Sequence, residues 1–193
     1  MNTTRFLLIR HAESAWNAAG RWQGHGDPPL SERGRRQAAA LAERLAGEGL
    51  SSLLSSDLRR AFETAEILAM RLGLSLRTSP VFRELDIGSW TGLTRDELEA
   101  RARADLATFE AGEPDFRPGG GESRSEIRAR VRGGVEDLAR RDPGARIGLV
   151  THLGVIRALL PGRELGHVET CWASLAEIRA ATASASHAGS GPP

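Results

Sequence analysis

Lysine and tyrosine are both absent from this chain of 193 residues, and all 26 of its lysine-plus-arginine positions are arginines. These absences exclude a reaction through a lysine Schiff base or a tyrosine general acid. A coding bias explains most of the arginine content more simply than a function does. The formal net charge of +1 gives no reason to expect nucleic acid or an acidic membrane as a partner.

Cysteine and long hydrophobic runs are also scarce. The single cysteine, Cys171, excludes an internal disulfide and offers no metal-ligand spacing, so a reducing compartment is the simpler expectation. No apolar run approaches the roughly 20 residues of a membrane span. Met1–Arg5 leads directly into an apolar segment, which leaves no room for a signal peptide. We therefore expect a soluble cytoplasmic protein.

An apolar segment near the N-terminus gives the first indication of a site. Phe6–Ile9 is apolar without alternation, which is typical of a strand buried on both faces of a parallel sheet. The segment ends at Arg10 and His11, and α/β sheets bind ligands just outside the carboxyl ends of their strands. In this arrangement the guanidinium of Arg10 could bind an anion, and the imidazole of His11 could act as a nucleophile or base. Ordinary surface charge at a strand end is the alternative.

The rest of the chain alternates between short apolar strands and amphipathic helices. Further strands are predicted at Leu50–Leu54, Leu74–Arg77, Arg146–Thr151 and Trp172–Ile178. Helices are predicted to begin at Ser31, at Ser55-Ser56-Asp57, and at the capping boxes Thr94/Glu97 and Ser123/Glu126. This alternation predicts a three-layer α/β/α sandwich with a mostly parallel central sheet.

The chain shows no repeat and no linker between domains. We expect a single domain over residues 1–179, with a cap-like helical insertion at about residues 94–118. The segment 180–193 is small and polar, and it is predicted to be a disordered tail.

Two of the predicted strands end in the same way, because Val150-Thr151 is followed by His152. If the two strands are neighbours in the sheet, His11 and His152 face one pocket. Arg60 lies in the first turn of the helix that begins near Asp57, close to another strand end. Together with Arg10 it offers two planar forks, which match a phosphate with two negative charges. A solvated helix residue is the alternative reading of Arg60.

Three further titratable residues have simpler explanations at this point. His25 and His167 have no comparable context, and we expect both at the surface. Glu84 could form an ion pair with Arg83 or Arg117, or it could take part in chemistry.

Five segments in the same order resemble the histidine phosphatase (phosphoglycerate mutase-like) superfamily. RHAESAWN resembles the signature RHGExxxN, SSDLRRAFETAE is similar to SxLxRAxxTA, and FRELDIGSWTGLT is similar to LxExxxGxWEG. QGHGDPPLSERGRRQA is similar to the loop and first helix of the family, and LVTHLGVIRALL to its second histidine motif. The resemblance covers about residues 5–160 and implies a phosphoglycerate mutase-like fold.

The resemblance also implies roles for individual residues. His11 would be the nucleophile that forms a phosphohistidine by in-line attack, and Glu84 would protonate the leaving oxygen and later take a proton from water. Adjacent guanidinium groups would keep the imidazole of His11 neutral and stabilise charge without a metal. We expect no metal and no other cofactor. The phosphoryl group would be bound by Arg10, Arg60 and His152, with assistance from Asn17, Gln23 and Gly24.

The chain departs from the family pattern at three positions. Ala12 and Leu153 stand where glycine is usual, and Thr91 stands where many members have glutamate. These departures bear on substrate choice and rate more than on reaction type.

A phosphatase acting on small phosphorylated metabolites is the favoured function. Mutases of the family carry a longer insertion after the acid, with tyrosine and lysine residues that this chain lacks. Mutase-type phosphoryl transfer is the first alternative, and a non-catalytic phosphate-binding module is the second. We expect a small phosphorylated substrate as partner, neither nucleic acid nor a membrane, and leave a homodimer open. A cap arginine that turned inward would indicate a second anionic group on the substrate; the candidates are Arg95, Arg101, Arg103 and Arg117.

Overall fold

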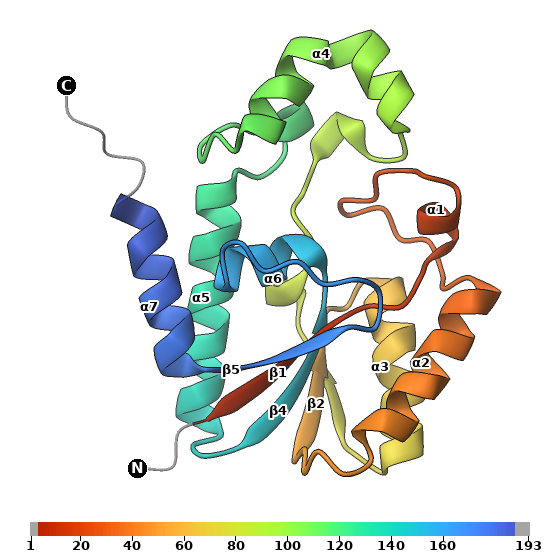
Figure 1. The fold of residues 1–193 in the computed structure, drawn as a ribbon, viewed down its shortest axis with the longest axis vertical. Coiled ribbons are helices and arrows are strands. Elements are labelled where there is room, and N and C mark those ends of the chain that lie inside the picture. The colour runs from red at the N-terminus through yellow and green to blue at the C-terminus, as the bar shows by residue number, and fades with distance from the viewer. Residues whose placement is uncertain (1–3, 188–193) are drawn as a thin grey trace.

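The computed structural model describes residues 4–187, which form one sheet between two layers of helices (Figure 1). The sheet has the strand order β3-β2-β4-β1-β5, and only β5 runs antiparallel to its neighbour, β1. The predicted α/β sandwich with a mostly parallel sheet is therefore confirmed. The strand bounds are β1 Arg5–Arg10, β2 Ser52–Ser55, β3 Leu76–Thr78, β4 Arg146–Thr151 and β5 Thr170–Ser174.

Both faces of the sheet are covered, as the unbroken apolar run of β1 requires. Successive side chains of a strand point to opposite faces. Phe6 and Leu8 accordingly pack with α5 (Arg124–Arg141) and α6 (Leu153–Leu159), whereas Leu7 and Ile9 pack with α2 (Glu32–Leu45) and α3 (Arg59–Leu72). In Figure 1 the first helical layer lies on the left and the second on the right. A further covering helix is α7 Leu175–His187.

The helix α4, Arg95–Ala111, lies beyond the carboxyl ends of the parallel strands, at the top of Figure 1. Ala102 interrupts its helical geometry with a φ of −147°. The remaining elements are short: α1 Ala15–Ala18 and three 3₁₀ turns at Pro80–Phe82, Gly88–Trp90 and Pro118–Gly120. The helix α4 therefore lies above the strand ends where the sequence predicts the site (Figure 1).

Most predicted helix starts are confirmed by their hydrogen bonds. The hydroxyl of Ser31 accepts from the amide of Gly34, and reciprocal capping boxes open α4 and α5 at Thr94 and Ser123. The predicted cap of α3 at Ser55-Ser56-Asp57 is wrong. This helix begins after Leu58, which provides no side-chain cap.

The side chains expected to cap α3 have other partners. The Ser56 hydroxyl accepts from the amide of Leu58, before the helix begins. The Asp57 carboxylate forms a bidentate ion pair with Arg83, at 2.8 and 2.6 Å. Because Arg83 directly precedes Glu84, this pair anchors the segment that carries the candidate acid.

The C-terminal expectations are corrected in two respects. The last strand ends at Ser174 rather than at Ile178, and a helix follows through His187, so the predicted disorder from Ala180 is wrong up to that residue. Ser174 caps the helix, because its hydroxyl accepts from the amide of Glu177 while its own amide donates to the Glu177 carboxylate. Ile178 is fully buried. Residues 188–193 of the predicted tail lie outside the described residues.

No helix within residues 4–187 is both long enough and apolar enough to span a membrane.

Candidate active site

The parallel pairing of β1 with β4 brings the two predicted histidines together. Arg10 lies opposite Thr151 in the register, and the amide of His11 donates to the carbonyl oxygen of Thr151 at 2.9 Å. His11 and His152 therefore leave adjacent strands at the same level, and their ring centroids are 5.1 Å apart. Both side chains are buried. The structure thus brings the two imidazole rings side by side, as the two strand ends indicate.

The hydrogen bond of His11 determines which ring nitrogen can act as a nucleophile. Its Nδ1 lies 2.7 Å from the carbonyl oxygen of Ala12. A carbonyl oxygen only accepts, so Nδ1 carries the hydrogen and Nε2 keeps its lone pair. The backbone of Ala12 is unstrained, since Val168 is the only non-glycine residue in the described part of the chain with a positive φ. Alanine therefore replaces the usual glycine here without a conformational cost.

Burial and nearby positive charge both keep the imidazole of His11 neutral. Burial lowers the pKa of His11 well below 6.5, and the guanidinium groups of Arg60 and Arg10 lower this pKa further. Desolvation is the larger cause, whereas the sequence indicates only the effect of the arginines. Burial likewise lowers the pKa of His152 well below 6.5, with Arg60 and His11 as further causes.

Arg60 is completely buried in the first turn of α3. Its two terminal nitrogens donate to the carbonyl oxygens of Gly26 and Gly24, at 2.7 and 2.9 Å. Burial lowers the pKa of Arg60 to about 10, so the side chain is still charged at neutral pH. The adjacent Arg59 is exposed and instead donates to Glu63 at 2.6 Å. Arg60 is therefore the arginine of this pair that lies with the histidines.

Several buried nitrogens at this place have no acceptor. Arg10 donates from Nη1 to the carbonyl oxygen of Leu165 at 2.7 Å. Its Nε, the Nε of Arg60 and both ring nitrogens of His152 find no partner anywhere in residues 4–187. Buried polar groups are normally paired, so a cluster of unpaired nitrogens, at least three of which carry a hydrogen, is an unusual feature. A tetrahedral anion such as phosphate offers the acceptors that these groups lack.

Asn17, Gln23 and Gly24 line the cavity that also contains Arg10 and Glu84, and this cavity has a volume of about 330 Å³. The hydroxyl of Ser14 lies 3.0 Å from the side-chain oxygen of Asn17 and 2.6 Å from that of Gln23. Because these amide oxygens are turned toward Ser14, the amide N–H groups are left for an anion.

Glu84 is not used in an ion pair within the described chain. Its carboxylate accepts from the amides of Leu85 at 2.9 Å and Gly154 at 3.4 Å. Arg83 pairs with Asp57, and Arg117 pairs with Glu126, so the proposed ion pairs of Glu84 are wrong. A Cβ atom at Gly154 would lie 2.2 Å from the Glu84 carboxylate, so only glycine allows this approach.

Two histidines that the sequence places at the surface lie next to these groups. The ring of His167 is 5.8 Å from that of His11, and its buried Nε2 has no acceptor among residues 4–187. A ring nitrogen of His25 lies 2.8 Å from the carbonyl oxygen of Glu84. Both surface assignments are wrong. His167 precedes β5, and only the antiparallel pairing of β5 with β1 brings it near His11.

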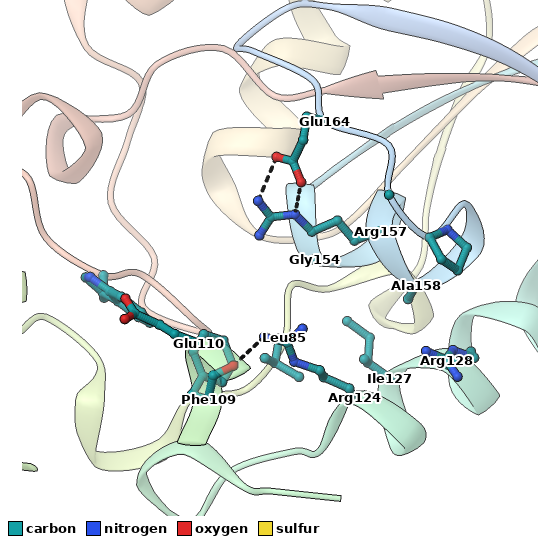
Figure 2. A pocket seen from close by; sticks show the side chains of 13 residues that line it. Leu85, Phe109, Glu110, Arg124, Ile127, Arg128, Gly154, Arg157, Ala158 and Glu164 are labelled. Atoms are coloured by element: carbon teal, nitrogen blue, oxygen red, sulfur yellow. Dashed lines mark hydrogen bonds and ion pairs between the residues drawn. The ribbon is translucent and has the colours of Figure 1, made fainter. Parts of the chain in front are cut away.

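A second cavity of about 540 Å³ adjoins the first, and Figure 2 shows its lining. Arg157 forms a bidentate ion pair with Glu164 there, at 2.7 and 2.6 Å (Figure 2). The lining also includes Arg124 and Arg128, which belong to α5. None of the four cap arginines lines either cavity: Arg95 pairs with Glu99 and Glu110, Arg117 pairs with Glu126, and Arg101 and Arg103 are exposed.

The positive charge of the site comes from guanidinium groups. Within residues 4–187 no three His, Cys, Asp or Glu side chains are grouped as metal ligands. A neutral imidazole with a free Nε2, the buried Arg60, the half-buried Arg10 and a carboxylate at the cavity wall together suit an α/β protein that transfers phosphoryl groups.

Comparison with known families agrees with this class. The model of the histidine phosphatase superfamily (branch 1) matches residues 6–184. The chain belongs to this superfamily, and the family predicted from the five motifs is confirmed.

Two relatives illustrate the range within the family. Glucosyl-3-phosphoglycerate phosphatase of Mycobacterium tuberculosis is 40% identical over 168 residues, which are 82% of this chain and 74% of the relative. Phosphoglycerate mutase-like protein 4 of Arabidopsis thaliana is 40% identical over 156 residues, or 79% and 68% of the two chains. The solved structure of the mycobacterial glucosyl-3-phosphoglycerate phosphatase with VO3 has a TM-score of 0.79 at 35% identity, and the match covers 87% of this chain and 90% of that one. The predicted enzyme class, a histidine-type phosphatase, is thereby confirmed.

The lowered pKa values of His11 and His152 predict how stability depends on pH. Below pH 6.5 the unfolded chain binds protons that these buried imidazoles do not, so the free energy of unfolding falls as the pH falls. Each imidazole contributes a slope of up to about 1.4 kcal/mol per pH unit. Urea unfolding between about pH 5 and pH 7 measures this slope. The slope should be shallower in His152→Gln, and an equal slope in both proteins would contradict the assignment.

Proposed function

We propose that this protein hydrolyses small phosphate monoesters through a phosphohistidine at His11. The observation that carries the proposal is the free Nε2 of a buried, neutral imidazole beside unpaired nitrogens of Arg10, Arg60 and His152. The mycobacterial relative, a phosphatase of a glucosylated phosphoglycerate, supports a small phosphorylated metabolite as substrate.

The proposed reaction has two steps. In the first, Nε2 of His11 attacks phosphorus, and the P–N bond forms as the P–O bond to the leaving group breaks, with Glu84 giving its proton to the leaving oxygen. In the second, water attacks phosphorus, Glu84 accepts a proton from it, and the P–N bond breaks to release phosphate. Glu84 thus returns to its starting protonation state after each turnover.

The phosphate-binding residues stabilise charge in both steps. Arg10, Arg60 and His152 hold the equatorial oxygens, and their positions are fixed by the protein before the substrate binds. The amides of Asn17 and Gln23 and the loop at Gly24 assist. The proposal requires neither a metal nor another cofactor. It also includes a cytoplasmic location, which the single cysteine supports.

Mutase-type transfer is the second candidate, because the chain also resembles phosphoglycerate mutase-like protein 4. We favour hydrolysis, since this chain contains no lysine or tyrosine with which family mutases grip a bisphosphate. A non-catalytic phosphate-binding module is less favoured, because His11 and Glu84 are both retained.

The role of His11 is tested with p-nitrophenyl phosphate in the presence of EDTA. We expect the wild-type protein to release nitrophenol and His11→Ala to lose this activity, because no other group replaces the attacking nitrogen. Rapid quenching in alkali should trap the phosphohistidine only in the wild type. Equal activity in the two proteins would remove His11 from the mechanism, and absence of activity in both would support the binding module.

The assignment of Arg60 as a phosphate-binding residue is tested by comparing alanine substitutions of Arg60 and of its neighbour Arg59. Arg60→Ala leaves negative charge on the phosphoryl group uncompensated and should cost at least about 2 kcal/mol in kcat/KM, or about 30-fold. Arg59→Ala removes the same charge from an exposed position and should change kcat/KM little. The reverse order of effects would show that the wrong arginine is assigned.

The role of Glu84 is tested by the leaving group. Glu84→Gln should slow hydrolysis of alkyl phosphates far more than that of p-nitrophenyl phosphate, because nitrophenolate departs without a proton. Steady-state kcat values for both substrates provide the comparison. Similar losses on the two substrates would argue against Glu84 as the acid.

A further inference from the structure

The larger cavity continues the phosphate site on the side of the leaving group. It shares a wall with the smaller cavity, formed by Trp22, Leu85, Phe109, Gly154 and Arg157. The carboxylate of Glu84 lies against this wall, since it accepts from the amide of Gly154. The group that Glu84 protonates is the leaving oxygen, so the rest of the leaving group extends into the larger cavity.

The larger cavity carries positive charge that the described residues do not neutralise. Its two carboxylates are both engaged: Glu164 is paired with Arg157 (Figure 2), and Glu110 is paired with Arg95. Arg124 and Arg128 lie one helical turn apart on α5 and have no ion pair in residues 4–187. Like charges at this spacing are unfavourable for the helix, which makes an anionic ligand the natural counterpart.

Arg124 is held in a fixed orientation. Its guanidinium lies over the ring of Phe109, with the central carbon 4.7 Å from the ring centroid. Its Nη2 donates to the carbonyl oxygen of Phe109 at 2.7 Å, a bond drawn in Figure 2. These contacts use one edge of the guanidinium and leave the other N–H groups for a ligand.

Arg128 presents the second guanidinium. Its Nε is buried and finds no acceptor in the part of the chain that the structure describes. Arg124, Arg128 and Arg157 line the same cavity, and Arg157 and Arg128 lower the pKa of Arg124 after the larger effect of burial. An anion that accepts hydrogen bonds from both guanidinium groups would supply the missing acceptor and reduce the repulsion between the two arginines.

The remaining lining of the larger cavity is apolar. Leu85, Ile127 and Ala158 contribute aliphatic side chains to it, and Trp22 and Phe109 add aromatic surface. A volume of about 540 Å³ is within the range of small-molecule sites. The cavity therefore suits a chain or ring that separates a phosphate ester from a second charge.

We propose that the substrate is a phosphate monoester whose leaving group carries a second anionic group, bound by Arg124 and Arg128. This inference rests on the proposed phosphatase function. A carboxylate and a second phosphate share the chemistry that a guanidinium fork recognises, and the test separates them.

The test uses pairs of substrates that differ only in the second charge. The carboxylate arm compares ω-phosphooxyalkanoates of about three to eight carbons with their methyl esters. The phosphate arm compares α,ω-alkanediol bisphosphates with the monophosphates of the same length. For one arm, at a preferred chain length, we expect kcat/KM for the charged member to exceed that of the neutral one about tenfold.

Arg128→Gln should bring this ratio close to one, because it removes the charge and the unpaired Nε together. Arg132→Gln is the matched control, since Arg132 lies one turn further along α5, is exposed and pairs with Glu136. This control should keep the wild-type ratio. A ratio near one at every length, or an unchanged ratio in Arg128→Gln, would overturn the inference and leave the phosphatase function standing.

Binding to His11→Ala tests the inference without turnover. Calorimetry with the same pairs should show tighter binding of the charged member, and this preference should be lost when Arg128→Gln is added. Absence of turnover in the wild type together with a retained binding preference would reject the function alone. Equal binding of both members would reject the second-anion site.

Discussion

The pairing of β1 with β4 is the interaction on which the rest of the structure depends. It places Arg10 opposite Thr151, so the residues that follow, His11 and His152, emerge side by side. A slip of one residue would turn each side chain of β1 to the other face of the sheet. Phe6 and Leu8 pack with one helical layer and Leu7 and Ile9 with the other, so the register also determines which helices each of these side chains contacts.

Burying the charged and polar groups of the site costs electrostatic free energy. Unpaired buried nitrogens of Arg60 and His152 are unfavourable in a protein interior. The chain limits this cost in two ways. The carbonyl oxygens of Gly24 and Gly26 bind the terminal nitrogens of Arg60, and burial keeps the pKa values of both histidines low enough for the neutral form. What is left unpaired is the set of donors that a phosphoryl group can satisfy.

Local signals in the sequence predict most of the fold and the central residues of the site. Each of these signals can be recognised within a few neighbouring positions: the capping boxes, the apolar run of β1 and the two histidines at strand ends. The errors concern features that depend on distant partners: His167 reaches His11 only because β5 pairs antiparallel with β1. Likewise, Arg124 and Arg128 point into the cavity from α5, whereas the sequence directed attention to the arginines of the cap. No periodicity or spacing carries that information.

Glu84 lines the smaller cavity next to the wall between the two cavities, and this position bears on the order of events in the proposed reaction. In the proposed reaction the alcohol leaves phosphorus on the same side from which water later attacks it. The carboxylate of Glu84 exchanges a proton with both. The alcohol must therefore leave the larger cavity before water can enter. Water and any second alcohol then compete for the emptied cavity, and the one that enters first receives the phosphoryl group. On this scaffold, the outcome of that competition would distinguish a hydrolase from a transferase.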